Sequence, residues 1–246
     1  MTPITPENLL EELRRAAGVV AGITAALSEE DVKAPSELPG WTRGHVLAHL
    51  SGIANAMARQ LEFAARGDSI ELYDGGFEGR TRAIDMAAGH TLAEHRADVD
   101  AALGRALQDF ETLDAAGWQV PISYRGGVVL DGGLALWREL TIHATDLGTG
   151  RGPETWSRAF CGHLFEFLAA RVPEGERFVL QPLGLPAVAI GAPGGRSTAI
   201  NGMLTDIAAW LAGRTPTLGS LRATAAADGV DLPALLPWPA GVPATR

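Results

Sequence analysis

The sequence predicts a four-helix bundle joined to a smaller domain that mixes helices with strands, an α domain followed by an α+β domain. In the first 150 residues, four long stretches place apolar residues at helical spacing, and most of their connections are short. Such a pattern favours a bundle. After Gly150 short strand-like runs alternate with helical segments, which is typical of an α+β domain. We therefore expect two domains, residues 1–150 and 151–246.

The first two helices of the bundle are predicted on either side of a proline-containing loop. The first begins at Pro6, and the loop that follows it spans residues 28–40. Thr42 is a good N-cap for the second helix, which should run to about Arg66. The apolar stripe of the first helix consists of Leu9, Leu10, Leu13, Ala17, Val20, Ile23 and Leu27.

The third and fourth helices are separated by turn-rich segments. Residues 67–79 form a long loop, and the third helix should extend from residue 80 to residue 113 with a break near Gly89. A short hairpin is expected at residues 124–127. The fourth helix then ends at Gly148, a suitable residue to follow a helix C-terminus.

The second domain should contain two helices and three strands. Helices are predicted over residues 154–172 and 198–212, because both segments have an apolar side at helical spacing. Strands are predicted over residues 177–180, 187–190 and 218–224.

The composition excludes several classes of function. The net charge of −9 over 246 residues argues against a nucleic-acid partner, since phosphate binding needs a basic face. The N-terminus lacks the pattern of a signal peptide, and no apolar run approaches the length that spans a membrane. One cysteine, Cys161, fits a reducing compartment and is expected in the core rather than as a nucleophile. We expect a soluble, cytoplasmic protein with no membrane partner.

Glu139 and His143 are the residues that suggest a metal site. At i and i+4 of a helix they share one face, so a carboxylate and an imidazole can bind the same divalent ion. Most such pairs are solvated surface residues, and a catalytic zinc needs a third protein ligand. His45 and His49 form a second i, i+4 pair near the start of the second helix. Spacing alone does not decide between them, and our working hypothesis is His49.

Three segments resemble the mycothiol-dependent maleylpyruvate isomerase family, and together they cover nearly the whole chain. They are residues 38–50, residues 137–147 and, more loosely, residues 206–214. The resemblance implies a DinB-like, antiparallel four-helix bundle followed by a small α/β domain. It also implies a zinc ion held by His49, Glu139 and His143, with the thiol of mycothiol at the remaining zinc position.

The resemblance also implies a reaction. Only a thiolate is a good nucleophile, and coordination to zinc deprotonates a thiol that otherwise titrates near pH ~8.5. Conjugate addition to the cis double bond of maleylpyruvate, rotation and elimination would give fumarylpyruvate. Two alternatives stay open: a mycothiol S-transferase acting on another electrophile, and a non-catalytic metal-binding or sensor protein. The expected partners are a small thiol and a small electrophilic substrate, and the expected state is a monomer.

The two carboxylates of maleylpyruvate require cationic partners. Arg214 is the preferred catalytic residue because it stands in the Gly-Arg pair that matches the family's second domain. Arg43 and Arg196 are further possibilities, the latter because it precedes a predicted helix N-terminus, which attracts anions. Asp146 either accepts a hydrogen bond from a ligand histidine or lies exposed at the helix end.

Overall fold

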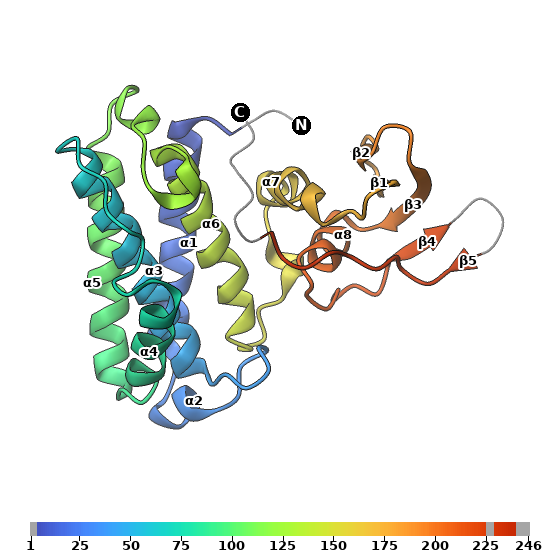
Figure 1. Ribbon diagram of the computed structural model, residues 1–246. Coiled ribbons are helices and arrows are strands. Elements are labelled where there is room, and N and C mark those ends of the chain that lie inside the picture. Colours follow the sequence, from blue (N-terminus) through green and yellow to red (C-terminus); the bar gives the residue numbers. More distant parts are fainter. Residues whose placement is uncertain (1–3, 225–228, 240–246) are drawn as a thin grey trace. The chain divides into compact units, whose positions relative to one another are not determined.

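The computed structural model describes residues 4–224 and 229–239, and the chain divides into two compact units (Figure 1). The helical unit spans Thr5–Gly150, and the second unit consists of the described residues from Arg151 onward. Within the described ranges, no helix has both the length and the apolar character that a membrane span requires.

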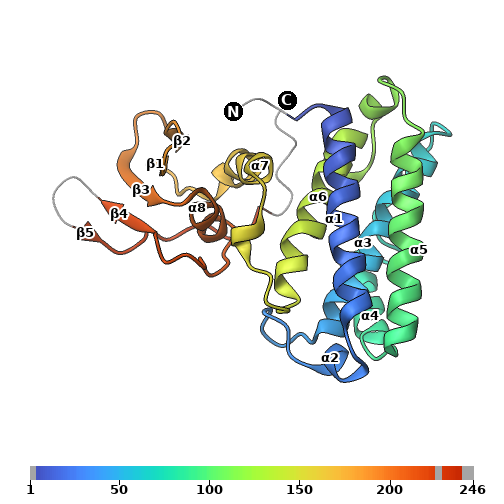
Figure 2. The ribbon, with the colours of Figure 1, turned by 180° about the vertical axis from the view of Figure 1, so that it is seen from behind.

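The helical unit is built around four long helices, α1, α3, α5 and α6, which pack as a bundle (Figure 2). Helix α1 contacts α5 and α6, and α3 contacts the same two helices from the other side. The helices of this unit are α1 Pro6–Ala26, α2 Glu29–Lys33, α3 Arg43–Ala64, α4 Gly76–Ala87, α5 Leu92–Glu111 and α6 Val129–Asp146, and its 3-10 turns are η1 Gly117–Gln119 and η2 Tyr124–Gly126.

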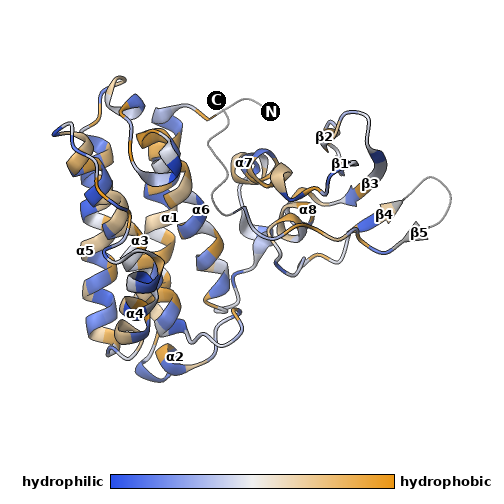
Figure 3. Ribbon diagram, in the orientation of Figure 1, coloured by the Kyte–Doolittle hydropathy of each residue, from blue (hydrophilic) through white to orange (hydrophobic). Residues whose placement is uncertain are grey.

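Each long helix carries apolar and polar residues in alternation along its length, as Figure 3 shows. The apolar residues meet between the helices, which removes their surface from water and stabilises the bundle. The largest fully buried side chains of this unit are Leu9, Leu13, Leu47, Leu50, Met57, Phe110, Leu136, Trp137 and Leu140.

Local capping explains where several helices begin. Thr42 accepts a hydrogen bond from the backbone N–H of His45 and starts α3, as the sequence predicts. Thr91 does the same for α5 through Glu94, with the Glu94 carboxylate accepting from the Thr91 backbone. The predicted break near Gly89 is confirmed, because α4 ends before it and α5 begins after it.

Three details of the bundle in the structure differ from the sequence prediction. The first loop contains the short helix α2, started by the reciprocal capping pair Ser28 and Asp31. Helix α4 begins at Gly76 rather than at Arg80. The expected hairpin at residues 124–127 is instead the 3-10 turn η2, bounded by a single bridge between Pro121 and Val128.

The second unit contains a mixed five-stranded sheet with the order β2-β1-β3-β4-β5. Strands β1 and β3 are parallel, and the other neighbours pair antiparallel. Its elements are η3 Pro153–Thr155, α7 Arg158–Leu168, η4 Ala169–Arg171, β1 Glu176–Pro182, β2 Val188–Gly191, β3 Arg196–Gly202, α8 Leu204–Leu211, β4 Arg222–Thr224 and β5 Gly229–Val230.

The predicted helix over residues 198–212 is wrong in its first part. That part is strand β3, which pairs with β1 on one side and β4 on the other, and only the remainder is helix α8. Thr198 and Ile200 alternate into the core at the strand period, and this sheet packing overrides the local helical pattern. The strands predicted at residues 177–180 and 187–190 are confirmed as parts of β1 and β2.

Candidate metal centre

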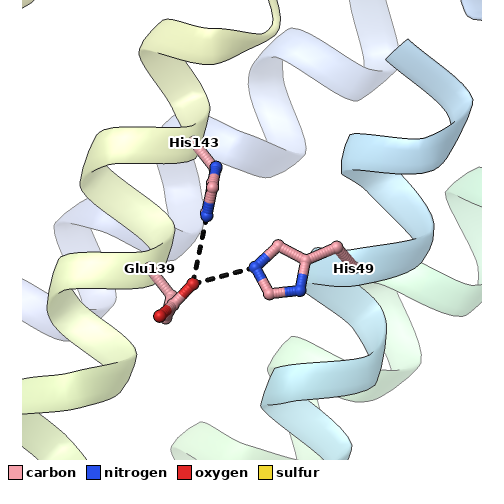
Figure 4. A group of neighbouring side chains, drawn as sticks. All are labelled: His49, Glu139 and His143. Carbon is pink, nitrogen blue, oxygen red and sulfur yellow. Dashed lines mark hydrogen bonds and ion pairs between the residues drawn. The ribbon is translucent and has the colours of Figure 1, made fainter. Parts of the chain in front are cut away.

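Helices α3 and α6 bring His49, Glu139 and His143 together (Figure 4). One possible ligand atom from each residue lies within 4.8 Å of the other two. His49 comes from α3 and the other pair from α6, one helical turn apart. The structure thus joins the three residues that the family resemblance implies.

The three side chains converge on one carboxylate oxygen. Oε2 of Glu139 lies 2.8 Å from Nε2 of His49 and 3.1 Å from Nε2 of His143. The two imidazole rings are nearly perpendicular, at 88°, with centroids 4.6 Å apart. Both histidines therefore present the same ring nitrogen to the same point.

Close packing fixes the helix that carries His49. A Cβ added at Gly44, near the start of α3, would lie 2.6 Å from the backbone oxygen of Ala88. Only glycine allows this approach of α3 to the segment that follows α4. On the next turn, Leu47 and Leu50 are fully buried in the bundle and fix the rotation of α3.

Burial and charge act differently on the two histidines. Burial lowers the pKa of His49, which is only 3% exposed, so this ring is neutral near pH 7. Burial also disfavours charge on His143, but hydrogen bonds to Asp146 and Glu139 outweigh it and raise the pKa of His143 to about 9. Burial opposes the charge of Glu139 too, yet hydrogen bonds from both histidines hold the Glu139 pKa well below its ordinary value.

Asp146 supports His143 from behind. Its carboxylate Oδ2 lies 2.8 Å from Nδ1 of His143, and the residue is 1% exposed. A carboxylate accepts from Nδ1–H, so this contact holds a proton at Nδ1 and orients Nε2 toward Glu139. Of the two positions the sequence left for Asp146, the structure shows the supporting one.

Arg80 approaches the centre from α4, and the sequence pattern did not reveal it. Its Nη2 lies 3.0 Å from Nδ1 of His49, and its guanidinium lies 5.7 Å from the ring centroid of Tyr73. Trp41 packs edge-on against His49, with ring centroids 5.9 Å apart. Nothing in the spacing of these residues marks them, because they come from a loop and from a helix that the periodicity places too late.

His45, the alternative to His49, has another role. Its Nδ1 accepts a hydrogen bond from the backbone N–H of Thr42 at 3.2 Å and closes the cap of α3. Its ring stacks on Trp41 with centroids 6.0 Å apart. His45 lies outside the three-residue cluster.

The three arginines that the sequence suggested for substrate binding have different contacts in the structure. Arg43 donates to the carbonyl oxygens of Leu147 and Gly148 and so closes the C-terminus of α6. Arg196 begins strand β3 rather than preceding a helix, and it forms an exposed ion pair with Glu176. Arg214 lies in the second unit, where its Nη1 donates to the carbonyl of Ala212 at 2.9 Å.

The donor set fits a divalent metal. Two imidazoles and one carboxylate are typical of catalytic zinc, which keeps a fourth position for water or substrate. Ligands at zinc distances stand roughly 3.3 Å apart in a tetrahedron, only slightly wider than the 2.8 and 3.1 Å found here. The Glu139 side chain is 31% exposed, so the centre is in contact with solvent on this side.

Comparisons with known proteins agree with this architecture. Residues 13–148 match the family model described as the mycothiol maleylpyruvate isomerase N-terminal domain, and residues 155–237 match the MDMPI C-terminal domain. No curated protein sequence matches the chain.

Two solved structures resemble the chain closely in fold. One is a crystal structure of the mycothiol-dependent maleylpyruvate isomerase, with a TM-score of 0.82 and 19% identity over 96% of this chain and 99% of that one. The other is a histidine-to-alanine mutant of that isomerase, with a TM-score of 0.81, the same identity and the same coverage. The likeness confirms the predicted fold class, a helical bundle with a second, mixed domain.

Proposed function

The chain belongs to the mycothiol-dependent maleylpyruvate isomerase family, a family of enzymes, and from that premise we propose that it isomerises maleylpyruvate to fumarylpyruvate with zinc and mycothiol. The observation that carries the proposal is the convergence of His49, Glu139 and His143 within 4.8 Å. Three protein donors leave the fourth position of a tetrahedral zinc for the sulfur of a thiol.

The isomerisation needs a nucleophile that adds to the cis double bond and later leaves. Addition forms a carbon–sulfur bond and moves the electron pair of the double bond to the adjacent carbon and its carbonyl group. The former double bond is then single and rotates. Return of the electron pair re-forms the double bond, expels the same thiolate and gives the trans product. A zinc ion bound here would lower the pKa of a thiol ligand so that the thiolate exists at neutral pH.

Glu139, His49 and Asp146 have different roles at the proposed metal site. The low pKa of Glu139 keeps its carboxylate charged, and one carboxylate together with one thiolate balances a divalent cation. His49 is neutral because it is buried, which leaves Nε2 able to bind a metal once its proton moves. Asp146 fixes the ring of His143, so the direction of Nε2 is set before any ligand arrives.

The experiment is a zinc measurement joined to an activity assay. Wild type should hold about one zinc per chain and convert maleylpyruvate only when mycothiol is present. His49→Ala, Glu139→Ala and His143→Ala should lose both properties together. His90→Ala is a matched control, since this half-exposed histidine pairs with Asp98 away from the centre.

The same assay separates the alternatives. Turnover of an epoxide or another electrophile, with none of maleylpyruvate, would identify a mycothiol S-transferase. Tight zinc binding with no turnover of any acceptor would identify a binding or sensor protein. A turnover rate that survives the loss of zinc would refute the proposed chemistry.

The expected setting is part of the proposal. We place the enzyme in the cytoplasm as a monomer, with zinc and mycothiol as its cofactors and with no nucleic acid or membrane as partner. The role of Arg214 as a catalytic residue remains a prediction, which Arg214→Met tests in the assay above.

A further inference from the structure

We infer that Arg80 binds a carboxylate of the substrate, and that metal binding at His49 releases Arg80 for this role. The inference rests on the proposed function, because it names the part of the site that recognises an anionic electrophile. The observations are the contact of Arg80 with Nδ1 of His49 and its place above the ring of Tyr73.

The contact fixes where the proton of His49 lies. A guanidinium has donors and no acceptor, so Nδ1 of His49 must accept from Nη2 of Arg80 at 3.0 Å. The neutral ring then carries its proton at Nε2, which donates to Oε2 of Glu139 at 2.8 Å. His49 thus keeps its only proton at Nε2, whereas Nδ1 of His143 carries a proton that it donates to Asp146.

A metal at Nε2 of His49 is incompatible with this arrangement. Nε2 can bind a cation only without its proton, and the neutral imidazole must then carry the proton at Nδ1. Two donors, Nδ1–H and the Arg80 guanidinium, would face one another at hydrogen-bond distance. Arg80 therefore loses its hydrogen bond to His49 when a metal binds, and its N–H groups become available to another acceptor.

Arg80 remains close to the centre after this change. It belongs to α4, which packs on α3, and its guanidinium lies over the ring of Tyr73, an arrangement that favours a cation. The side chain is half-buried, so an anion bound to it would be partly shielded from water. A planar guanidinium also matches the two oxygens of a carboxylate.

Two other arginines of the helical unit, Arg43 and Arg59, have different partners. Arg43 donates to the end of α6, and Arg59 donates to the Asp74 carboxylate and to the backbone oxygen of Glu71. Arg80 instead contacts a residue of the metal centre directly. The Glu139 carboxylate repels a dianion that enters beside it, and the Arg80 guanidinium next to His49 supplies the cation that offsets this repulsion.

The first test measures anion binding without turnover. Zinc-loaded wild type and Arg80→Met are titrated with fumarate by calorimetry. Loss of a charged hydrogen-bonded contact should weaken binding about 10- to 150-fold. Arg82→Met is the matched control, because Arg82 lies on the same helix, is 68% exposed and pairs only loosely with Glu78. Equal binding by wild type and Arg80→Met would overturn the inference.

The second test measures zinc affinity by competition with a chelating dye. Arg80→Met should bind zinc at least as tightly as wild type, because the donor that opposes the metal-binding tautomer is gone. If Arg80→Met instead weakens zinc binding while circular dichroism shows it folded, Arg80 is a structural support of His49 and the inference fails.

A third test separates recognition of the anion from the chemistry. With maleylpyruvate, Arg80→Met should raise KM about tenfold or more and change kcat little, and Arg80→Lys should recover part of the loss. Dimethyl maleate is a cis alkene without charge, and its turnover should not respond to the substitution. Equal effects on both substrates would contradict a carboxylate-binding role.

The two proposals fail in different ways. Fumarate binding that depends on Arg80, in a protein that does not isomerise maleylpyruvate, would refute the proposed function and leave the role of Arg80 standing. Thiol-dependent isomerisation with unchanged anion affinity in Arg80→Met would do the reverse.

Discussion

His143 pairs with the buried Asp146, and Nδ1 of the imidazole lies 2.8 Å from Oδ2 of the carboxylate. They stand at i and i+3 on α6, so the helix itself sets their distance. The pair holds one proton of His143 at Nδ1, on the side away from Glu139. The other ring nitrogen is therefore aimed at the position where a metal would bind.

Asp146→Asn should weaken zinc binding while the bundle stays folded. An amide is a weaker acceptor than a carboxylate, and losing such support behind a ligand histidine typically costs about 10- to 100-fold in metal affinity. Competition with a chelating dye measures the change. Asp98→Asn is the control, because Asp98 pairs with His90 away from the centre and should leave zinc affinity unchanged. Unchanged affinity in Asp146→Asn would show that this contact does not orient His143.

Glu139→Gln should abolish tight zinc binding without unfolding the protein. It keeps the size of the side chain but removes the negative charge on which both histidines converge. The core of α1, α3, α5 and α6 does not involve this residue, so helicity measured by circular dichroism should match that of metal-free wild type. A variant that keeps one tightly bound zinc per chain would exclude Glu139 as a ligand.

Arg43→Met should destabilise the fold and leave anion binding unchanged. The Arg43 side chain is 16% exposed and donates to the backbone at the end of α6 and to Asp31. Losing these charged hydrogen bonds should lower the free energy of unfolding by about 2 kcal/mol. Urea denaturation measures this loss. Weaker fumarate binding in a folded Arg43→Met variant would return Arg43 to the list of substrate ligands.

The sequence predicted the parts of the site that lie on periodic helices. Glu139 and His143 share a helix face, so their proximity follows from spacing alone. The choice of His49 over His45 came from the family resemblance, and the structure gives a physical reason for it. His45 is occupied by the cap of α3, where its Nδ1 receives the backbone N–H of Thr42.

The contacts that could not be predicted from the sequence depend on how the chain folds back after a loop. Arg80 reaches His49 because the chain after α3 turns back and α4 packs on that helix. No local pattern encodes this return. The strand β3 was missed for a related reason, because its pairing with β1 and β4 is decided by residues distant in sequence.

Gly44→Ala should destabilise the protein although alanine is the better helix former. The added Cβ would lie 2.6 Å from the backbone oxygen of Ala88, which cannot move away as a side chain would. We expect a loss of about 1–3 kcal/mol in the free energy of unfolding. Gly52→Ala on the same helix has nothing within 4 Å and should stabilise by about 0.5–1 kcal/mol. Equal changes in the two variants would show that the close approach at Gly44 carries no cost.

The pH dependence of stability should report the charged state of His143 in the metal-free protein. Its folded pKa of about 9 lies above the unfolded value near 6.5, so its contribution is complete below about pH 6.5 and is lost as the pH rises toward 9. Between these limits the folded state holds one more proton than the unfolded state. The free energy of unfolding should then fall by about 1.4 kcal/mol per pH unit from this residue.

Below this window the free energy of unfolding falls as the pH falls. The cause is His49, whose pKa is lowered in the fold, so it stays neutral there while the same histidine in the unfolded chain takes up a proton. Metal-free protein should therefore be most stable near pH ~6.5. Urea denaturation at several pH values, in wild type and in His143→Asn, isolates the contribution of His143. The variant should lose the decline above pH ~6.5. A decline of the same slope in both proteins would mean that His143 is not protonated in the fold, and the hydrogen-bond pattern around Glu139 would have to be reassigned.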